Sequence, residues 1–494
     1  MTTTHVLRGS EICELLEAGG LAYECDAAFA ALRFEHISEY AELVRENGLY
    51  IHRRYRAAAP SVPQAQANGA LAYVSDQRIP TTLPCLYTPS VFKAATAISR
   101  AFYDNSADRL EKVLVIGTKG KTTTSRMLHA ILSAADPRPS AYCTTNRSFD
   151  GKVEEQFAGT VSDPSIFYPL CERALANGCW RMVAEMPSYA ELCARLDGLS
   201  FAHGIFTNLD YDHVSPYGHR TYEGYVACKK RMFSRCQHVL ANLDDPRCDE
   251  FIDAAHAQSS MTFSPSGDER ADFSVHDIRP WRHGHAFTVT TPSWEEELRI
   301  SMPGVFSVHN ALAAIGQAWV WGIGPQAIRE GIRDAHAEGR MMVYEHGDYL
   351  AFVDFAHNGL SFRAVLESLR ADYPSRRIVV VSGVGGRISA YCHEGIADAI
   401  ARYADRCIVT TDNPLDEDPA LLCQGLHDRI VQGGGSARIV LDRAQAIRSA
   451  VEELRADEVL LVAGKGTDRE QSYFDHDEPY EGDDVLTERY LGQK

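Results

Sequence analysis

The chain has 494 residues, of which 45% are hydrophobic and 23% are charged. A chain of this length and composition can bury several hydrophobic cores, and we expect about three domains. Its formal net charge of −18 argues against a nucleic-acid partner, because phosphate neutralisation requires clustered lysine and arginine.

The N-terminal part mixes short helical and strand patterns. Residues 11–18 and 91–103 have helical periodicity, residues 70–76 have a strand pattern, and the polar stretch 104–109 indicates a linker. From residue 112 onward, apolar strands alternate with amphipathic helices. This alternation predicts a mainly parallel sheet with helices on both faces.

A second alternating series begins after the helical stretch 309–336. We therefore predict an α/β protein of three domains. They are a small α/β domain over 1–108, a central P-loop ATPase-like parallel-sheet domain over 109–338, and a Rossmann-like α/β domain over 339–494.

The cysteines and the N-terminal segment indicate a cytoplasmic protein. The 13 cysteines form no CxxC pair, and the N-terminus has no basic region followed by an apolar run and a cleavage site. No stretch approaches the ~18 consecutive apolar residues of a membrane span. We expect reduced thiols and no membrane span.

The stretch VLVIGTKGKTTT (113–124) carries the clearest chemical signal. An apolar strand leads Gly117 and Gly120 to a helix N-terminus, where free N–H groups and the helix dipole favour phosphate. Two residues separate these glycines, whereas the usual phosphate loop has four. Lys121 would contact the β- and γ-phosphates, and the Thr122 hydroxyl would bind Mg²⁺.

Two further strands lead to possible metal ligands. Glu185 ends the strand in RMVAEM, and His213 follows the strand in HGIFTNL. Because the C-terminal ends of parallel strands face the crevice of an α/β sheet, both side chains are placed to reach a metal beside the phosphates. A surface carboxylate and a structural histidine are the alternatives. The next helical pattern contains Lys229 and Lys230, which local composition does not distinguish from a solvated face.

Polar loops follow three strands of the last unit. Asp354 and His357 follow the first strand, residues 410–419 the second and residues 462–471 the third. Together these loops predict one composite site, although each alone is also compatible with a plain connection.

Taken in order, these motifs resemble those of the Mur ligase family, ATP-dependent ligases that join an amino acid to a carboxylate of the peptidoglycan precursor. The resemblance runs from about residue 70 to the end of the chain. It is carried by GTKGKTTT, AEMPSYAEL, FTNLDYDHVSPYG, the KKRMF lysine, ANLDDP, PGVFSVHNALAAIG, GRMMV, VDFAHNGLSF, DNPLDEDP and AGKGTDREQ. Such an ordered set is more specific than any single motif.

Within the family, the chain resembles the MurE type, which adds the third amino acid. DNPxxEDP, and AGKG followed closely by an acidic residue and Gln, are typical of that branch. GTKGKTT, DFAHNG and EPYEGDDVLTERYL resemble the streptococcal-type enzymes that add L-lysine. Diaminopimelate-adding enzymes carry Arg after DNP, where this chain has Leu415, so a second substrate carboxylate would lose its guanidinium partner.

The resemblance implies a mechanism. ATP would phosphorylate the D-glutamate carboxylate of UDP-N-acetylmuramoyl-L-alanyl-D-glutamate, and the amine of L-lysine would attack the acyl phosphate. Loop amides, Lys121 and Mg²⁺ would offset the charge on the transferring phosphoryl group. Two Mg²⁺ ions are implied, held by Thr122, Glu185, His213 and Lys229. CO₂ would be bound as a carbamate on Lys229, and the implied catalytic residues are Lys121, Glu185, His213 and Lys229.

The resemblance also implies three binding groups. The ATP group would be Gly117, Thr118, Lys119, Gly120, Lys121, Thr122, Thr123, Asn310, Arg340, Asp354 and His357. The UDP-sugar-peptide group would be Thr160, Val161, Ser162, Ser188 and Arg195. The amino-acid group would be Arg387, Asp412, Asn413 and Asp468, where acidic residues suit a lysine ammonium.

The chain departs from the family pattern at three places. Pro187-Ser188 replaces a Ser-Ser pair, and the first domain lacks an Asp-Ser-Arg triplet near residues 40–43. Residues 383–395 lack the usual Gly-Gly-Asp-Arg, for which Arg387 is the candidate substitute. These departures concern the two substrates rather than ATP.

Two alternatives to the lysine-adding ligase stay open. One is a Mur-like ligase with another acid or amine, and the other is a non-catalytic ATP-binding regulatory protein of the same fold. The second-metal residues argue against the non-catalytic alternative, because a mere binder need not keep them. We further expect a monomer with small-molecule substrates, and a hinge near Glu338 whose closure excludes water from the acyl phosphate.

Overall fold

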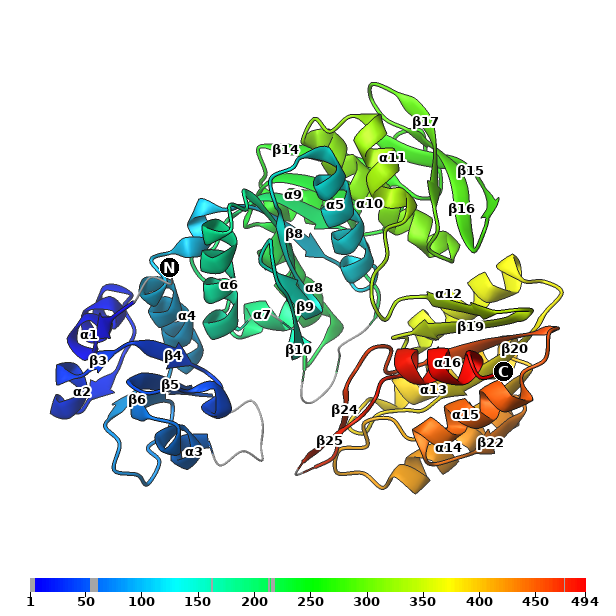
Figure 1. The fold of residues 1–494 in the computed structure, drawn as a ribbon. Helices are drawn as coiled ribbons and strands as arrows, with labels where there is room; N and C mark the ends of the chain where they lie inside the picture. The colour runs from blue at the N-terminus through cyan, green and yellow to red at the C-terminus, as the bar shows by residue number, and fades with distance from the viewer. Residues whose placement is uncertain (1–4, 54–60, 161–162, 212–213, 215–217, 475) are drawn as a thin grey trace.

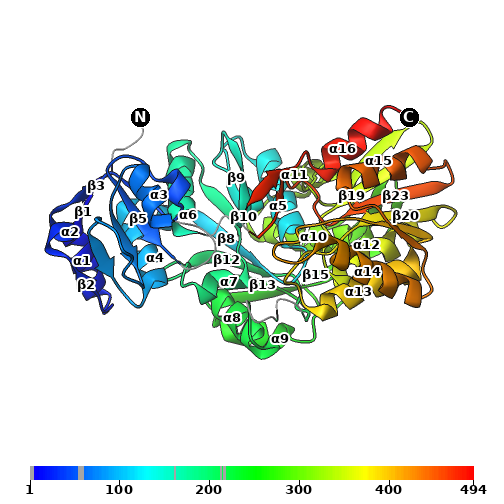
Figure 2. The same ribbon diagram turned by 90° about the horizontal axis from the view of Figure 1, so that it is seen from below.

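The computed structural model describes residues 5–53, 61–160, 163–211, 214, 218–474 and 476–494. Three α/β bodies follow one another along the chain, and the central one contacts both of the others (Figure 1; Figure 2). The predicted α/β class is confirmed, while the domain limits at 108/109 and 338/339 remain a prediction. Within the described ranges, no helix combines the length and apolar composition that a membrane crossing requires.

The N-terminal body contains a five-stranded sheet of order β2-β7-β6-β5-β4, parallel except for β2. Its strands are β2 (Glu24–Cys25), β4 (His36–Ser38), β5 (Gly48–His52), β6 (Ala70–Ser75) and β7 (Cys85–Tyr87), with a small pair β1 (Leu7–Arg8) and β3 (Arg33–Phe34). Its helices are α1 (Gly9–Ala18), α2 (Ala27–Ala31), α3 (Ser61–Ala67) and α4 (Val91–Phe102). The predicted linker includes a short 3₁₀ helix, Ser106–Arg109.

The central body contains a ten-stranded sheet of order β10-β9-β11-β8-β12-β13-β14-β15-β16-β17. Strands from β9 to β15 in this order are parallel, whereas β10, β16 and β17 are antiparallel additions that the sequence pattern did not predict. The strands are β8 (Glu111–Ile116), β9 (Ala141–Phe149), β10 (Glu154–Thr160), β11 (Arg181–Glu185), β12 (Phe201–Phe206), β13 (Cys236–Asn242), β14 (Ser259–Ser264), β15 (Phe273–Trp281), β16 (Gly284–Thr290) and β17 (Glu295–Ile300).

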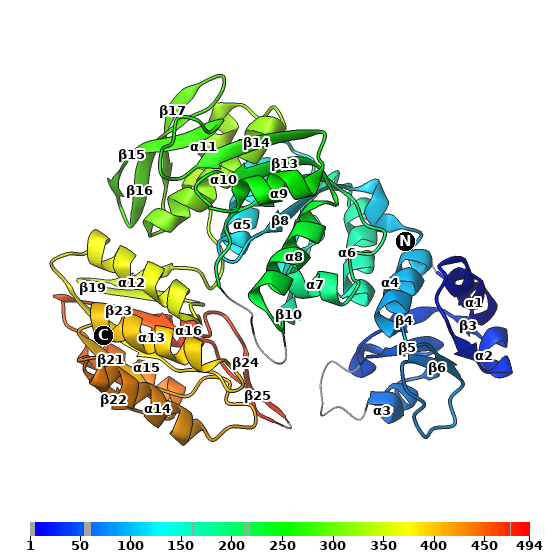
Figure 3. The same cartoon turned by 180° about the vertical axis from the view of Figure 1, so that it is seen from behind.

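Helices cover both faces of the central sheet, as predicted (Figure 3). In β8, Val113 and Val115 belong to the core with α5, α10 and α11, whereas Leu114 and Ile116 belong to the core with α6, α7, α8 and α9. This alternation is the period of two expected for a strand. The helices are α5 (Lys121–Ala135), α6 (Pro164–Ala176), α7 (Ser188–Leu192), α8 (Tyr222–Phe233), α9 (Cys248–Ala255), α10 (Val305–Val320) and α11 (Pro325–Arg333).

The C-terminal body contains a six-stranded sheet of order β18-β19-β23-β20-β21-β22, parallel except for β18. The strands are β18 (Met342–His346), β19 (Tyr349–Asp354), β20 (Arg377–Ser382), β21 (Arg406–Val409), β22 (Ala437–Ile439) and β23 (Glu458–Ala463), with a separate pair β24 (Glu470–Ser472) and β25 (Asp477–Pro479). The helices are α12 (Gly359–Asp372), α13 (Ala390–Tyr403), α14 (Pro419–Gln432), α15 (Arg443–Glu453) and α16 (Asp483–Leu491).

A buried ion pair joins α15 to α16, and we predict a large effect on stability when it is broken. Arg443 Nε and Nη2 each donate to Asp483 at 2.7 Å, and both side chains are almost fully buried. Asp483→Ala should lower the free energy of unfolding by about 3–5 kcal/mol, because it leaves the Arg443 charge buried and unpaired. Urea unfolding followed by circular dichroism measures this loss. The exposed pair Arg448–Glu452 supplies the control, since Arg448→Ala should have no measurable effect; equal losses in both variants would contradict the prediction.

Candidate active site

The loop between β8 and α5 requires glycine at both predicted positions. Gly117 has φ 152° and Gly120 has φ 82°, in the region where side chains are strained. A Cβ at Gly117 would lie 1.9 Å from Thr207 Oγ1, and a Cβ at Gly120 would lie 2.1 Å from Asn310 Oδ1. The absence of a side chain at both glycines therefore lets the loop pass close to two polar side chains from other elements.

The loop holds Lys121 at the start of α5. Lys121 Nζ donates to the carbonyl oxygens of Gly117 and Thr118, both at 3.0 Å. The backbone of Lys119 is fixed from the neighbouring strand end, because its N–H donates to Asn208 Oδ1 at 2.9 Å. The ammonium of Lys121 is thus placed beside the loop at which a phosphate would bind.

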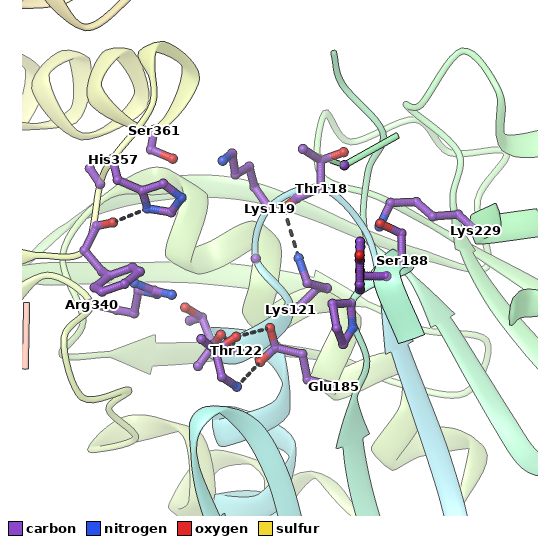
Figure 4. A pocket seen from close by; sticks show the side chains of 18 of the residues that line it. Thr118, Lys119, Lys121, Thr122, Glu185, Ser188, Lys229, Arg340, His357 and Ser361 are labelled. Carbon is purple, nitrogen blue, oxygen red and sulfur yellow. Dashed lines mark hydrogen bonds between the residues drawn. The ribbon is translucent and has the colours of Figure 1, made fainter. Parts of the chain in front are cut away.

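Thr122 and Glu185 meet beside this loop, as Figure 4 shows. Thr122 Oγ1 donates to Glu185 Oε2 at 2.8 Å, and the Glu185 carboxylate is 3% exposed. Thr145 donates to the same carboxylate from its N–H at 3.1 Å and from its Oγ1 at 2.9 Å. A hydroxyl and a carboxylate are hard oxygen donors, so this pair suits Mg²⁺.

The two adjacent lysines of α8 have different surroundings. Lys229 is 1% exposed, its Nζ donates to Gly117 O at 2.7 Å, and it lies 4.8 Å from the centre of the Tyr225 ring. Lys230 instead forms a surface ion pair with Glu250. Lys229 therefore lies beside the phosphate loop. His213, the remaining predicted metal ligand, lies outside the described residues.

A cavity of about 830 Å³ connects the three bodies. The phosphate loop, Glu185 and Lys229 line its middle. Most of the predicted ATP and UDP-sugar-peptide residues line it as well: Thr118, Lys119, Gly120, Lys121, Thr122, Thr123, Asn310, Arg340, Asp354, His357, Ser188 and Arg195. Of the others, Gly117 accepts hydrogen bonds from Lys121 and Lys229 at its carbonyl oxygen. The side chain of Thr160 and both Val161 and Ser162 fall outside what the structure describes.

The C-terminal body contributes the wall opposite the phosphate loop. Asp354 Oδ2 accepts from the N–H of Met341 at 2.8 Å, and burial raises the pKa of Asp354 while Arg340 and Lys119 act in the opposite direction. The Arg340 guanidinium lies 4.8 Å from the centre of the Phe355 ring. Lys119, Arg340 and Asp354 thus converge from both bodies on one side of the cavity.

The N-terminal end of the cavity contains charged residues that the sequence analysis missed. Arg195 donates to Asp163 at 2.6 Å, and Arg53 pairs with both Asp163 at 3.2 Å and Glu39 at 2.8 Å. Burial raises the pKa of Glu39, and Arg53 opposes this shift. The HRR sequence at the end of β5 was the available signal, but Arg53 pairs with Glu39 after β4 and with Asp163 in the central body, both distant in the sequence.

The predicted amino-acid group lies outside this cavity. The described residues that line it do not include Arg387, Asp412, Asn413 or Asp468. Lys465 Nζ donates to Asn413 Oδ1 at 2.7 Å. Gln471 Nε2 donates to Asp412 O at 3.0 Å, so the loops after β21 and β23 meet as predicted.

Arg387 makes a different contact. Its guanidinium donates in bidentate fashion to Asp416 at 2.7 and 2.8 Å. Its role as a substitute for the missing Gly-Gly-Asp-Arg arginine stays a prediction. To bind an amino acid, Arg387 would have to leave Asp416 or contact Asp416 and the substrate at the same time.

Comparison with known proteins agrees with this geometry. Residues 115–318 match the Mur ligase middle domain, and residues 339–466 match the Mur ligase glutamate ligase domain. The chain is 30% identical over 443 residues to the UDP-N-acetylmuramoyl-L-alanyl-D-glutamate--L-lysine ligase of Enterococcus faecalis, covering 87% of this chain and 86% of that enzyme. The chain belongs to the Mur ligase family. The predicted family is therefore confirmed.

Other relatives of this Mur ligase carry a different name. It is 33% identical over 402 residues to the UDP-N-acetylmuramoyl-L-alanyl-D-glutamate--2,6-diaminopimelate ligase of Chlorobaculum tepidum, covering 77% of this chain and 76% of that enzyme. A solved structure of a UDP-N-acetylmuramoyl-L-alanyl-D-glutamate--2,6-diaminopimelate ligase has the same fold, with a TM-score of 0.59 and 24% identity over 95% of this chain and 97% of the other.

Proposed function

We propose that this Mur ligase uses ATP to join L-lysine to UDP-N-acetylmuramoyl-L-alanyl-D-glutamate in peptidoglycan precursor synthesis. The observation that carries the proposal is the hydrogen bond between Thr122 and the buried Glu185 carboxylate next to Lys121 and Lys229, in a cavity that reaches both outer bodies. ATP would bind between the central and C-terminal bodies, and the acid substrate would extend toward the N-terminal body.

The residues around the loop suit phosphoryl transfer. The γ-phosphoryl group would pass from ATP to the D-glutamate carboxylate, which yields ADP and an acyl phosphate. The lysine amine would then form an amide bond, and phosphate would leave with the bonding electrons. Lys121 and the loop N–H groups would stabilise the negative charge of the phosphoryl group in the first step.

The donor set suits two Mg²⁺ ions, which would supply charge neutralisation at the phosphates. Thr122 and Glu185 offer one group of oxygen donors. His213 and Lys229 are proposed for the second ion. We propose that CO₂ forms a carbamate on Lys229, because that modification converts the lysine into an anionic oxygen ligand.

Lysine is the proposed amine because the amino-acid group contains two acidic residues and position 415 offers no guanidinium to a second carboxylate. Asp412 and Asp468 offer negative charge to a side-chain ammonium, and Leu415 occupies the position at which the diaminopimelate-adding enzymes carry arginine. Relatives named for lysine and for diaminopimelate match the chain at similar identity. The choice therefore requires an experiment.

Phosphate release tests the proposal directly. Purified protein receives ATP, Mg²⁺ and the UDP-linked dipeptide together with lysine, ornithine or diaminopimelate. We expect release with lysine alone. Release with diaminopimelate instead would show that the amine is wrong, whereas tight ATP binding without release for any amine would favour a non-catalytic protein.

Lysine affinity should depend on pH through Asp468. Burial raises the pKa of Asp468 to about 6, with Lys465 acting in the opposite direction. The carboxyl group is therefore ionised above this pH and gains a proton below it, which removes its attraction for the lysine ammonium. Calorimetric Kd values for lysine should rise about tenfold between pH 7.5 and 5. Asp468→Asn should abolish this dependence, and an unchanged slope in that variant would exclude Asp468 as its source.

A further inference from the structure

His219 lies in the cavity wall between the end of β12 and the start of α8. The predicted site did not include it. Its side chain is 4% exposed, and its Nε2 lies 2.8 Å from Ser188 Oγ, within hydrogen-bond distance. Ser188 begins α7, directly after the strand that ends in Glu185. This hydrogen bond therefore joins two segments on the side of the cavity assigned to the acid substrate.

His219 is itself supported from α8. The His219 and Tyr225 rings meet edge to face with centroids 5.1 Å apart, and the Tyr225 and Thr118 hydroxyls lie 3.0 Å apart. Thr118 belongs to the phosphate loop. A continuous series of contacts thus runs from the phosphate loop through Tyr225 and His219 to Ser188.

A serine hydroxyl needs such support if it is to bind a ligand in one direction. The Ser188 side chain has three staggered positions, and its hydroxyl hydrogen rotates to suit its partners. The preceding residue, Pro187, offers neither a hydroxyl nor a backbone N–H. Consequently a partner from another segment, rather than the adjacent residue, restricts the orientation of Ser188.

We propose that His219 is a positioning residue, which fixes the Ser188 hydroxyl for the acid substrate and aligns it with the phosphate loop through Tyr225. The inference rests on the proposed function, because it assumes that the acid occupies this side of the cavity. His219 need not touch the reacting atoms. Its removal should therefore act through Ser188.

A double-mutant cycle tests this coupling. The variants are Ser188→Ala, His219→Ala, the double variant and His219→Gln, whose amide retains a hydrogen-bonding group. Calorimetry measures the Kd of the UDP-linked dipeptide, and phosphate release gives KM for the dipeptide and for ATP. His219→Ala should raise both dipeptide constants about tenfold, the effect of one hydrogen bond, and leave the KM for ATP within twofold. The double variant should match Ser188→Ala, and His219→Gln should recover most of the affinity.

Other results would overturn the inference. The first is additive losses in the double variant, and the second is an unchanged dipeptide Kd in His219→Ala. The third is a fall in the melting temperature of His219→Ala together with equal rises in its KM for the dipeptide and its KM for ATP. His276→Ala, at an exposed position of β15, controls for loss of a histidine. Dipeptide binding without turnover in the wild type would contradict the ligase proposal alone, since the calorimetric cycle still tests His219. Absence of dipeptide binding in the wild type would overturn the inference too.

Discussion

Lys121→Met should lower the rate of phosphate release about 10³-fold, because under the proposed function it removes the positive charge that would face the transferring phosphoryl group. The Nζ group is held by the Gly117 and Thr118 carbonyl oxygens at 3.0 Å, so it is preorganised before ATP binds. Methionine has a similar length and preserves the start of α5. Steady-state phosphate release and calorimetry of a non-hydrolysable ATP analogue separate the effect on rate from that on affinity.

Lys119→Met supplies a matched comparison within the same loop. Lys119 contacts the neighbouring strand end through its backbone, whose N–H donates to Asn208 and whose carbonyl oxygen accepts from Thr207 and Asn208. These contacts survive the substitution, and we expect a loss of at most about tenfold. Similar losses in the two variants would refute a specific role for the Lys121 ammonium.

Lys229→Ala should also lower the activity about 10³-fold, because the second metal ion would lose an anionic ligand. The lysine is buried beside the phosphate loop, and its Nζ contacts Gly117 O at 2.7 Å. If the carbamate forms, removal of CO₂ from the buffer should lower wild-type activity, and bicarbonate should restore it. A carbamate signal in ¹³C NMR after addition of labelled bicarbonate would report the modification independently of turnover.

Lys230→Ala is the control for this substitution. Lys230 lies next to Lys229 on α8 but pairs with Glu250 at the surface, and its loss should leave activity unchanged. The melting temperature of Lys229→Ala establishes whether the variant still folds. Undiminished activity in a folded Lys229→Ala protein, together with no response to bicarbonate, would refute the carbamate.

The regular α/β part of the fold followed from local patterns. Apolar strands of four to six residues alternate with amphipathic helices, and this alternation predicts a mainly parallel sheet with helices on both faces. Antiparallel β10, β16 and β17 did not follow, because their pairing depends on which edges of the sheet stay open. The linker assigned to residues 104–109 contains a short 3₁₀ helix, a structure with little sequence signal.

The candidate site was predictable where neighbouring residues in the chain form it. Gly117, Gly120, Lys121 and Thr122 share one strand-to-helix turn, so the sequence signal for them is local. Arg53, Asp163 and Glu39 were missed because burial and pairing of charges between segments distant in the sequence have no local signature. The same holds for the Ser188–His219 hydrogen bond.

The sequence by itself determined the alternation of parallel strands and helices, the phosphate loop and the family, since each depends on periodicity, backbone requirements or ordered motifs. Tertiary structure decided the surroundings of Lys229, which the family resemblance had singled out: it is buried against the phosphate loop, whereas Lys230 pairs with Glu250 at the surface. It also decided that the amino-acid group lies apart from the main cavity. Both depend on how distant segments of the chain pack. In the case of the two lysines, adjacent helical residues have the same local sequence pattern and differ only in the residues that surround them.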